Sequence, residues 1–244
     1  MYNDFSEDYD RFVNWPARLA FELPFIRSLF PAGVSILDAA CGTGMHTLAL
    51  AQEGYQAVGA DLSEGMVARA RANAASSATT AAFEVAGFGQ LRRTFLRNFD
   101  GLICLGNSLP HLLTKSALEE ALNDFSACLK PGGLLLVQNR NFDAVLSHSE
   151  RWMEPQGDAR HLFVRFYDFE SGGLVNFNII ALKHESLGWQ QRVFTSQLHP
   201  WRKAELEHAL KSADWADIAW YGNLQGAPFD PAQSSNLVFT ARRK

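Results

Sequence analysis

Cysteine is scarce in this sequence, and no apolar run is long. Its 244 residues include three cysteines, Cys41, Cys104 and Cys128, which are widely spaced and form no C-x-x-C pair. This spacing excludes a zinc ribbon and a disulfide scaffold, and it predicts reduced thiols, as in cytoplasmic proteins. The richest apolar segment, residues 36–50, contains Asp38 and two glycines and is shorter than the ~20 residues that cross a bilayer. We therefore expect no membrane-spanning segment.

An excess of basic charge is also absent. Lysine and arginine number 22 against 26 aspartates and glutamates, a formal net charge of −4. A protein that binds nucleic acid without regard to sequence needs a basic face, so this class is excluded. The N-terminal segment MYNDFSEDYD has neither the basic nor the apolar region of a signal peptide. We expect a cytoplasmic protein whose partner is a small molecule, and the oligomeric state stays open, a homo-oligomer included.

The apolar content is high enough for a full core. Hydrophobic residues make up 47% of the chain and charged residues 20%, which excludes a disordered protein. At this length we expect one large domain with a small insertion. Strands are predicted at residues 34–38, 56–61, 81–85, 99–105 and 134–138, helices at 16–30, 44–52, 63–73 and 114–129, and a turn at 130–133. This alternation predicts a doubly wound, parallel α/β sheet that is covered on both faces.

The pattern changes after about residue 150. Segments 160–169, 174–184 and 189–199 have the composition of strands and are joined by short turns that contain glycine. They predict an antiparallel meander inserted beside the sheet. A helix is predicted at 201–212 and two closing strands at 215–221 and 236–241, which suit an antiparallel hairpin at one edge of the sheet.

The most informative segment is ILDAACGTGMHTLALAQEG, residues 36–54. A predicted buried strand ends at Asp38, a turn holds Gly42 and Gly44, and a helix follows. Glycines in such a turn let the backbone approach a ligand closely, and the helix N-terminus can receive an anionic group. The next strand ends at Asp61, 17 residues after Gly44. A carboxylate there can accept hydrogen bonds from both hydroxyls of a ribose.

Two ligand classes fit this geometry, beside a turn that binds nothing. Dinucleotide sites usually have G-x-G-x-x-G, but Thr47 stands at the third glycine position. The form D-x-x-C-G-T-G, with an acid closing the next strand, resembles the first two motifs of class I S-adenosylmethionine-dependent methyltransferases. FDGLICLGNSLPHL and LKPGGLLLVQNRNFDAVL, residues 99–112 and 129–146, resemble the glycine/sarcosine N-methyltransferase branch of that class. The resemblance covers residues 9–146 and is only architectural in the meander.

The resemblance implies a fold and a division of the chain. The fold is a doubly wound, mostly parallel, seven-stranded Rossmann-like sheet with an antiparallel hairpin edge and a small inserted antiparallel meander. Residues 1–30 would form a helical lid, residues 31–150 and 200–244 the cofactor-binding domain, and residues 151–199 an antiparallel subdomain on the substrate side.

The cofactor implied by the resemblance is S-adenosylmethionine. Asp61 would hold its ribose and Arg18 its carboxylate, and an aromatic face such as Trp15 attracts a sulfonium. The acidic residue that is common after the third strand is missing, so Phe88 or the backbone would contact the adenine. The implied cofactor-binding residues are Trp15, Arg18, Ala40, Gly42, Gly44, Asp61, Leu62, Met66, Gly87, Phe88 and Leu105.

Methyl transfer from a sulfonium is an in-line displacement, so the protein mainly supplies proximity and alignment. Asn107 and His111 follow the fourth strand and are the catalytic candidates. Arg140 and Asn141 follow the fifth strand and are the substrate-binding candidates, and the resemblance implies that Arg140 forks onto a substrate carboxylate. The meander offers Arg165, Tyr167, His184 and His199, among which the sequence does not choose.

The sequence therefore predicts an enzyme that methylates the amine of a small carboxylate-bearing molecule, such as an amino acid. An O- or C-methyltransferase of a small natural-product or cofactor precursor is one alternative, and a non-catalytic S-adenosylmethionine-binding protein is another. LGNSLP, after the fourth strand, lacks the aromatic residue that grips a flipped base. We expect no metal, because Asn107 follows the fourth strand and Asp143 is the lone carboxylate soon after the fifth.

Overall fold

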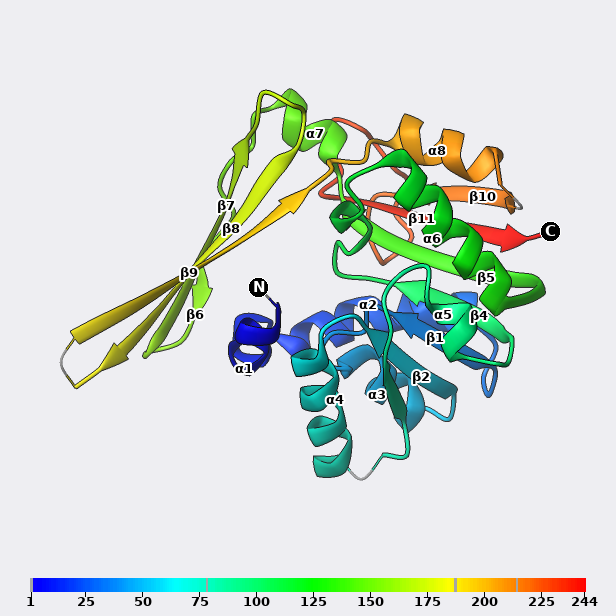
Figure 1. Ribbon diagram of the computed structural model, residues 1–244, viewed down its shortest axis with the longest axis horizontal. Coiled ribbons are helices and arrows are strands. Elements are labelled where there is room, and N and C mark those ends of the chain that lie inside the picture. The colour runs from blue at the N-terminus through cyan, green and yellow to red at the C-terminus, as the bar shows by residue number, and fades with distance from the viewer. Residues whose placement is uncertain (1, 78, 187, 214) are drawn as a thin grey trace.

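The computed structural model describes residues 2–77, 79–186, 188–213 and 215–244. Its named strands form two sheets, one of seven strands and one of four. Figure 1 shows the seven-stranded sheet inside a main body covered by helices, and the four-stranded sheet as an arm that projects from this body. The three cysteines are buried free thiols, as predicted.

The larger sheet has the predicted architecture. Its strand order is β10-β11-β5-β4-β1-β2-β3. Strands β1 to β5 run parallel, and β11 and β10 close one edge in antiparallel fashion. The strands are β1 (Ser35–Ala39), β2 (Gln56–Asp61), β3 (Ala82–Val85), β4 (Phe99–Cys104), β5 (Leu129–Arg140), β10 (Trp215–Tyr221) and β11 (Asn236–Arg243).

Side chains of the central strands alternate between two cores, as the period of two along a strand requires. Leu102 and Cys104 of β4 belong to one core, and Ile103 between them belongs to the other. The first core includes side chains of α6 (Lys115–Cys128) and α8 (Lys203–Lys211), and the second includes side chains of α2 (Trp15–Leu29) and α3 (Met45–Gln52). Helices therefore cover both faces, which explains the continuous apolar runs of the strands.

Polar side chains start the helices where the sequence places them. Ser63 Oγ accepts a hydrogen bond from the Met66 amide at 3.2 Å at the start of α4 (Glu64–Ser76), and Thr114 caps α6 in the same way. The sequence pattern did not predict three short helices: α5 (Leu91–Thr94), the 3-10 helix η1 (Leu109–His111) and α7 (Phe142–Ser147). No helix in the described part of the chain is long and apolar enough to cross a membrane.

Strand β5 begins earlier than predicted, because the expected turn at 130–133 is a bulge within it. Phe99 of β4 pairs with Leu129, whereas Gly101, two residues later, pairs with Leu134. The intervening residues of β5 therefore leave the ladder, and Gly132 among them has a φ of 74°. A positive φ of this kind favours glycine, which is why the pattern read as a turn.

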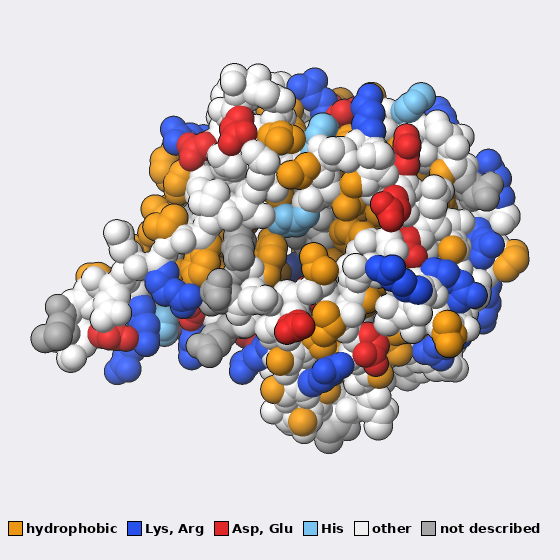
Figure 2. Space-filling model, in the orientation of Figure 1, with side chains coloured by type: hydrophobic (Ala, Val, Ile, Leu, Met, Phe, Trp, Pro, Cys, Tyr) orange, Lys and Arg blue, Asp and Glu red, His pale blue; other side chains and the backbone are white. Residues whose placement is uncertain are grey.

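The arm is an antiparallel sheet in the order β6-β7-β8-β9. Its strands are β6 (Gln156–Gly157), β7 (His161–Phe169), β8 (Val175–Glu185) and β9 (Gly188–Leu198). The three long strands match the predicted meander, and the two-residue β6 was not predicted. The surface is hollowed where the arm meets the main body (Figure 2).

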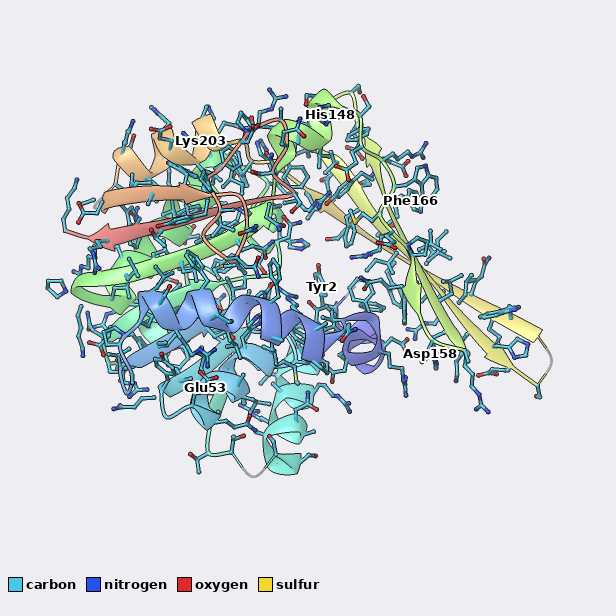
Figure 3. All side chains as sticks on the ribbon, turned by 180° about the vertical axis from the view of Figure 1, so that it is seen from behind. Tyr2, Glu53, His148, Asp158, Phe166 and Lys203 are labelled. Carbon is cyan, nitrogen blue, oxygen red and sulfur yellow. The ribbon has the colours of Figure 1, made fainter. Side chains whose placement is uncertain are left out.

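Helix α1 (Tyr2–Phe12) joins the two parts of the molecule. Phe5 and Phe12 pack with Phe163 and other apolar side chains of the arm. On the opposite side, Asn3 Oδ1 accepts hydrogen bonds from Ser63 Oγ at 2.6 Å and from the Gly65 amide at 3.2 Å. Tyr2 projects from this helix toward the space between the two sheets (Figure 3). The N-terminal segment therefore contacts both the main body and the arm.

Gly44 has a packing role at the start of α3. Its φ is 80°, and a Cβ atom would lie 2.6 Å from Phe83 Cε1 and 2.9 Å from Ala70 Cβ. The absence of a side chain therefore lets the turn after β1 pack closely against β3 and α4.

We expect Gly44→Ala to lower the free energy of unfolding for two reasons, backbone strain and overpacking. The left-handed backbone costs about 1–2 kcal/mol for a residue with Cβ, and overpacking against Phe83 and Ala70 adds about 1–3 kcal/mol. Gly132→Ala is the control, because Gly132 has a φ of 74° and no heavy atom within 4 Å of its would-be Cβ. Urea unfolding should show the larger loss for Gly44→Ala, and equal losses would contradict the packing role.

Candidate active site

Two cavities adjoin at the carboxyl ends of the parallel strands, where open α/β sheets bind ligands. The first has a volume of about 460 Å³ and the second about 390 Å³. The first is lined by residues at the ends of β1, β2 and β4, and the second by residues of β5, β7 and β8. Five residues line both cavities: Tyr2, Tyr9, Arg18, Gly106 and His111. We call these five shared residues the junction of the two cavities.

The wall of the first cavity is the turn that follows β1. Gly42 has a φ of 56°, and its amide donates to Asp61 Oδ2 at 2.8 Å. The Ser63 amide donates to Asp61 Oδ1 at 2.9 Å. Burial raises the pKa of Asp61, and these two hydrogen bonds oppose the rise. Each oxygen accepts one such bond, so lone pairs remain on both for a ligand's hydroxyl groups.

Asp38 stands at the end of β1 and is only 2% exposed. Its Oδ2 accepts a hydrogen bond from Thr47 Oγ1 at 2.7 Å. Burial raises the pKa of Asp38 to about 6. The carboxyl group therefore carries negative charge at neutral pH next to the glycine turn.

A chain of hydrogen-bonded side chains fixes Arg18 at the junction. Its Nε donates to both carboxylate oxygens of Glu22 at 3.1 Å, and Glu22 Oε2 lies 2.6 Å from His46 Nε2. Burial alone would raise the pKa of Glu22, but the hydrogen bond with His46 and the charge of Arg18 hold it below its ordinary value. The guanidinium lies 5.2 Å from the centre of the Trp15 ring. Glu22 and His46 thus hold Arg18 at the wall shared by the two cavities.

The part of the first cavity beyond Asp61 is mainly apolar. Met66 is buried, whereas Leu62 is 70% exposed and stands at the rim. Phe88 packs edge-on against Phe125, with ring centroids 5.4 Å apart. A Cβ on Gly87 would lie 3.0 Å from Leu62 Cδ1. These side chains make a slot suited to a flat, apolar ring.

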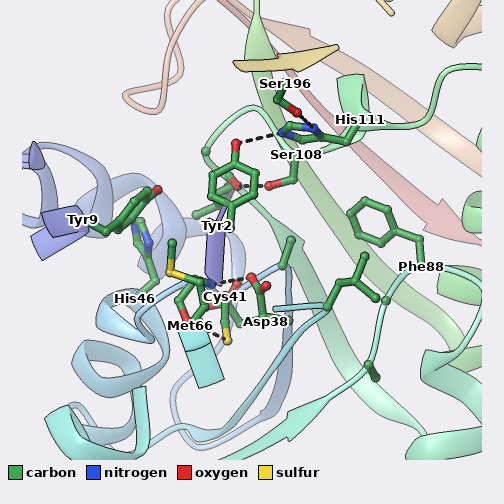
Figure 4. Close-up of a pocket in the computed structure, with 18 of the residues that line it drawn as sticks. Tyr2, Tyr9, Asp38, Cys41, His46, Met66, Phe88, Ser108, His111 and Ser196 are labelled. Carbon is green, nitrogen blue, oxygen red and sulfur yellow. Dashed lines mark hydrogen bonds between the residues drawn. The ribbon is translucent and has the colours of Figure 1, made fainter. Parts of the chain in front are cut away.

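His111 stands at the junction and is held by two hydroxyl groups. Its Nε2 lies 2.9 Å from the Tyr2 hydroxyl and its Nδ1 lies 3.2 Å from Ser196 Oγ, as Figure 4 shows. Burial lowers the pKa of His111 to about 4. The imidazole is therefore neutral at neutral pH, with one nitrogen that donates and one that accepts.

Besides Arg18, the guanidinium groups of Arg140 and Arg165 line the second cavity. Arg140 Nη2 donates to Glu150 Oε1 at 2.8 Å, and Arg165 Nη2 donates to the Glu154 carbonyl at 3.1 Å. The Nε of each arginine is buried and has no hydrogen-bond partner among the described residues. Burial raises the pKa of the neighbouring Tyr167, and the two arginines oppose this rise. Tyr167 is therefore a neutral phenol beside two cations.

The structure brings most of the predicted site residues together. The second cavity is lined by Asn107 and Arg140. Arg18 and His111 line both cavities. Asn107 has a φ of 67°, and its Oδ1 accepts a hydrogen bond from the Arg140 amide at 2.9 Å. The predicted residues that line the first cavity are Trp15, Arg18, Ala40, Gly42, Asp61, Leu62, Met66, Gly87, Phe88, Leu105 and His111.

Two predicted residues lie outside both cavities. Gly44 shapes the turn from behind, as its packing shows. Asn141 caps α7: its Oδ1 accepts from the Asp143 and Ala144 amides. Its Nδ2 donates to carbonyl groups of residues 230, 231 and 234. The amide is fully occupied, so Asn141 fastens a loop to α7 and is not available to a substrate.

Several site residues were missed or left undecided by the sequence. Arg165 and Tyr167, two residues apart on β7, line the second cavity. His184 instead packs edge-on against Trp189, and His199 stacks on Trp201. Glu22 could have been found from its i, i+4 spacing to Arg18 on a helix. Tyr2 gave no signal, because its place depends on how α1 docks.

We expect His111 to make stability depend on pH. Its pKa is about 6.5 in the unfolded chain and about 4 in the folded protein. Between these two pH values the unfolded state therefore binds more protons than the folded state. The free energy of unfolding should therefore fall by about 2 kcal/mol between pH 7 and pH 5 on account of this residue.

Urea unfolding of the wild type and of His111→Gln at both pH values measures this contribution. The variant should lose less stability on acidification. The raised pKa of Asp38 makes acidification increase stability, which is the opposite effect. Because Asp38 is present in both proteins, its contribution cancels when their losses are compared. Equal losses in the two proteins would contradict the shifted pKa of His111.

Comparisons with known proteins agree with this geometry. The family described as "Methyltransferase domain" matches residues 36–133. The chain is 34% identical over 197 residues to a glycine/sarcosine N-methyltransferase of Parasynechococcus marenigrum (strain WH8102), covering 74% of this chain and 70% of that protein. It is 29% identical over 230 residues to the enzyme of the same name from Aphanothece halophytica, covering 91% and 82%.

Solved structures share the fold. An S-adenosylmethionine-dependent methyltransferase from Clostridium acetobutylicum ATCC 824 superposes with a TM-score of 0.82 at 18% identity, covering 99% of this chain and 98% of that one. The chain therefore belongs to the glycine/sarcosine N-methyltransferase branch of the class I S-adenosylmethionine-dependent methyltransferases, and it is an enzyme that uses S-adenosylmethionine as its methyl donor.

Proposed function

We propose that the protein transfers a methyl group to the amine of a small carboxylate-bearing molecule, such as an amino acid. The observation that carries this proposal is the pair of cavities that meet at five shared residues, with arginines lining the second cavity. Relatives named glycine/sarcosine N-methyltransferase support the same substrate class.

The first cavity suits the methyl donor. Asp61 has lone pairs free for the ribose hydroxyls, and the slot between Leu62, Met66 and Phe88 suits an adenine ring. Arg18 would hold the carboxylate of the donor, and the backbone of Ala40, Gly42, Gly87 and Leu105 would supply polar contacts. Trp15 offers a π-face that attracts a positive sulfur. Helices α1 and α2 together would act as a lid over this cavity.

The donor supplies a methyl group that is already activated by a positively charged sulfur, so the protein needs to align the amine and exclude water. A neutral amine would attack the methyl carbon with its lone pair, so that the N–C bond forms as the S–C bond breaks, S-adenosylhomocysteine leaves, and the extra proton on the nitrogen passes to solvent. His111, with its pKa of about 4, is a weak base at neutral pH. We assign it a role in positioning the amine, together with Asn107, where the two cavities meet.

Asp61→Asn should weaken the binding of S-adenosylhomocysteine. The neutral amide keeps the shape of the side chain but loses one acceptor and the charge, and a hydrogen bond to a charged group contributes about 1.5–3 kcal/mol. We expect about a tenfold to hundredfold rise in Kd by calorimetry and a lower melting temperature, because the amide nitrogen then faces the N–H of either Gly42 or Ser63. Unchanged affinity would remove Asp61 from the donor site.

The substrate class is tested by the release of S-adenosylhomocysteine with a panel of amino acids, simple amines and phenols. We expect turnover with amines that carry a carboxylate. Turnover with phenols or carbon acids alone would favour an O- or C-methyltransferase of a small precursor and would overturn the proposal.

Arg140→Lys tests the contact to the carboxylate in the same assay. Lysine keeps the charge but not the fork of donors. KM for the amine should rise about tenfold or more, with little change in kcat. Glu150→Gln, which removes the ion-pair partner of Arg140, should not raise KM. If Arg140→Lys instead lowered the melting temperature and weakened donor binding together, Arg140 would be a brace for the loop that carries Glu150.

A further inference from the structure

Arg165 is a half-buried cation without an acidic partner. Its Nη2 meets the neutral carbonyl of Glu154, and its Nε has no hydrogen-bond partner among the described residues. No carboxylate in the described part of the chain lies within ion-pair distance of it. Its guanidinium lies 5.0 Å from the centre of the Phe12 ring, so α1 covers it. A buried guanidinium with unmet donors is costly unless an anion meets it.

The other two arginines of the second cavity are already compensated. Arg18 is held by Glu22, and Arg140 is held by Glu150. Arg165 is therefore the source of uncompensated positive charge in this cavity. Burial lowers the pKa of Arg165, but an arginine keeps its charge at neutral pH. A ligand that fills the cavity meets this charge whether or not its own carboxylate pairs with Arg140.

The second cavity is also larger than a minimal substrate requires. Its volume is about 390 Å³. Since a water molecule takes about 30 Å³ in the liquid, this space would hold on the order of ten waters. Glycine, the smallest amino acid, would leave most of it unfilled. Met153, Phe177 and Ile179 extend the cavity beside Arg165, which gives room for a side chain.

We propose that the methyl acceptor carries a second acidic group, a carboxylate or a phosphate, and that Arg165 binds it. This inference rests on the proposed function, in which Arg140 meets the acceptor's own carboxylate. The substrate class is then an amino acid with an acidic side chain, and Arg165 is the residue that selects it.

The test compares acidic acceptors with neutral ones of similar shape. Initial rates of S-adenosylhomocysteine release are measured with glutamate against glutamine, aspartate against asparagine, and O-phosphoserine against serine, with glycine as the reference. The wild type should favour at least one acidic member by about tenfold or more in kcat/KM, the lower end of what a charged hydrogen bond contributes. The carboxylate and phosphate pairs show which acidic group fits.

Three variants assign the preference to Arg165. Arg165→Met keeps an unbranched side chain but removes the charge, and it should abolish the preference, measured as the ratio of kcat/KM for the acidic and the neutral member of each pair, because the lost contact is absent with the neutral member. Arg165→Lys should restore part of the preference. Arg160→Met removes an exposed charge just before β7, away from both cavities, and should leave the preference intact. Melting temperature and S-adenosylhomocysteine affinity check that each variant folds.

The outcomes separate this inference from the function it rests on. Methylation of glycine or sarcosine without any preference for acidic acceptors would overturn the role of Arg165 and leave the proposed function standing. An equal loss with all acceptors in Arg165→Met, acidic and neutral, would also overturn it. Failure of every carboxylate-bearing amine would overturn the proposed function itself.

Discussion

Parallel pairing of β1 with β4 is the constraint on which the rest of the structure depends. From this pair the sheet grows outward on both sides, through β2 and β3 in one direction and through β5 in the other. The connections that follow β1 and β4 must therefore leave in opposite directions, and a crevice opens between them. Gly42 and Gly106, both with positive φ, turn the chain away at this point. Every residue of the two cavities is placed relative to that crevice.

Acidic side chains line one cavity and basic side chains the other, and this separation of charge suits a positively charged methyl donor and an anionic acceptor. Asp38 and Asp61 line the first cavity, whereas Arg140 and Arg165 line the second. A donor with a positive sulfur is favoured on the acidic side, and an anionic acceptor is favoured on the basic side. Arg18 lies between them and is neutralised by Glu22. The field of the fixed charges thus favours one orientation of the two molecules.

The sequence predicted the main sheet well, because its strands are buried on both faces and interrupted by clear glycine and cap signals. It also placed Asp61 and Gly42, since a strand, a turn and an acid occur in a set order. It did not decide between Arg165 and His184, because that choice depends on the pleat and register of β7 and β8, where a shift of one residue exchanges the two faces. Asn141 follows a strand as a site residue would, but a polar residue there can equally begin a helix.

Helix α1 has a thermodynamic consequence for the two ligands. Tyr2 and Tyr9 line both cavities, while Phe5 and Asn3 attach the helix to the arm and to α4. A molecule bound in either cavity that stabilises the docked helix also completes the wall of the other cavity. Binding of donor and acceptor is then cooperative, and linkage requires that each raises the affinity for the other by the same factor. After methyl transfer the same coupling acts on the products, so dissociation of one product lowers the affinity for the other.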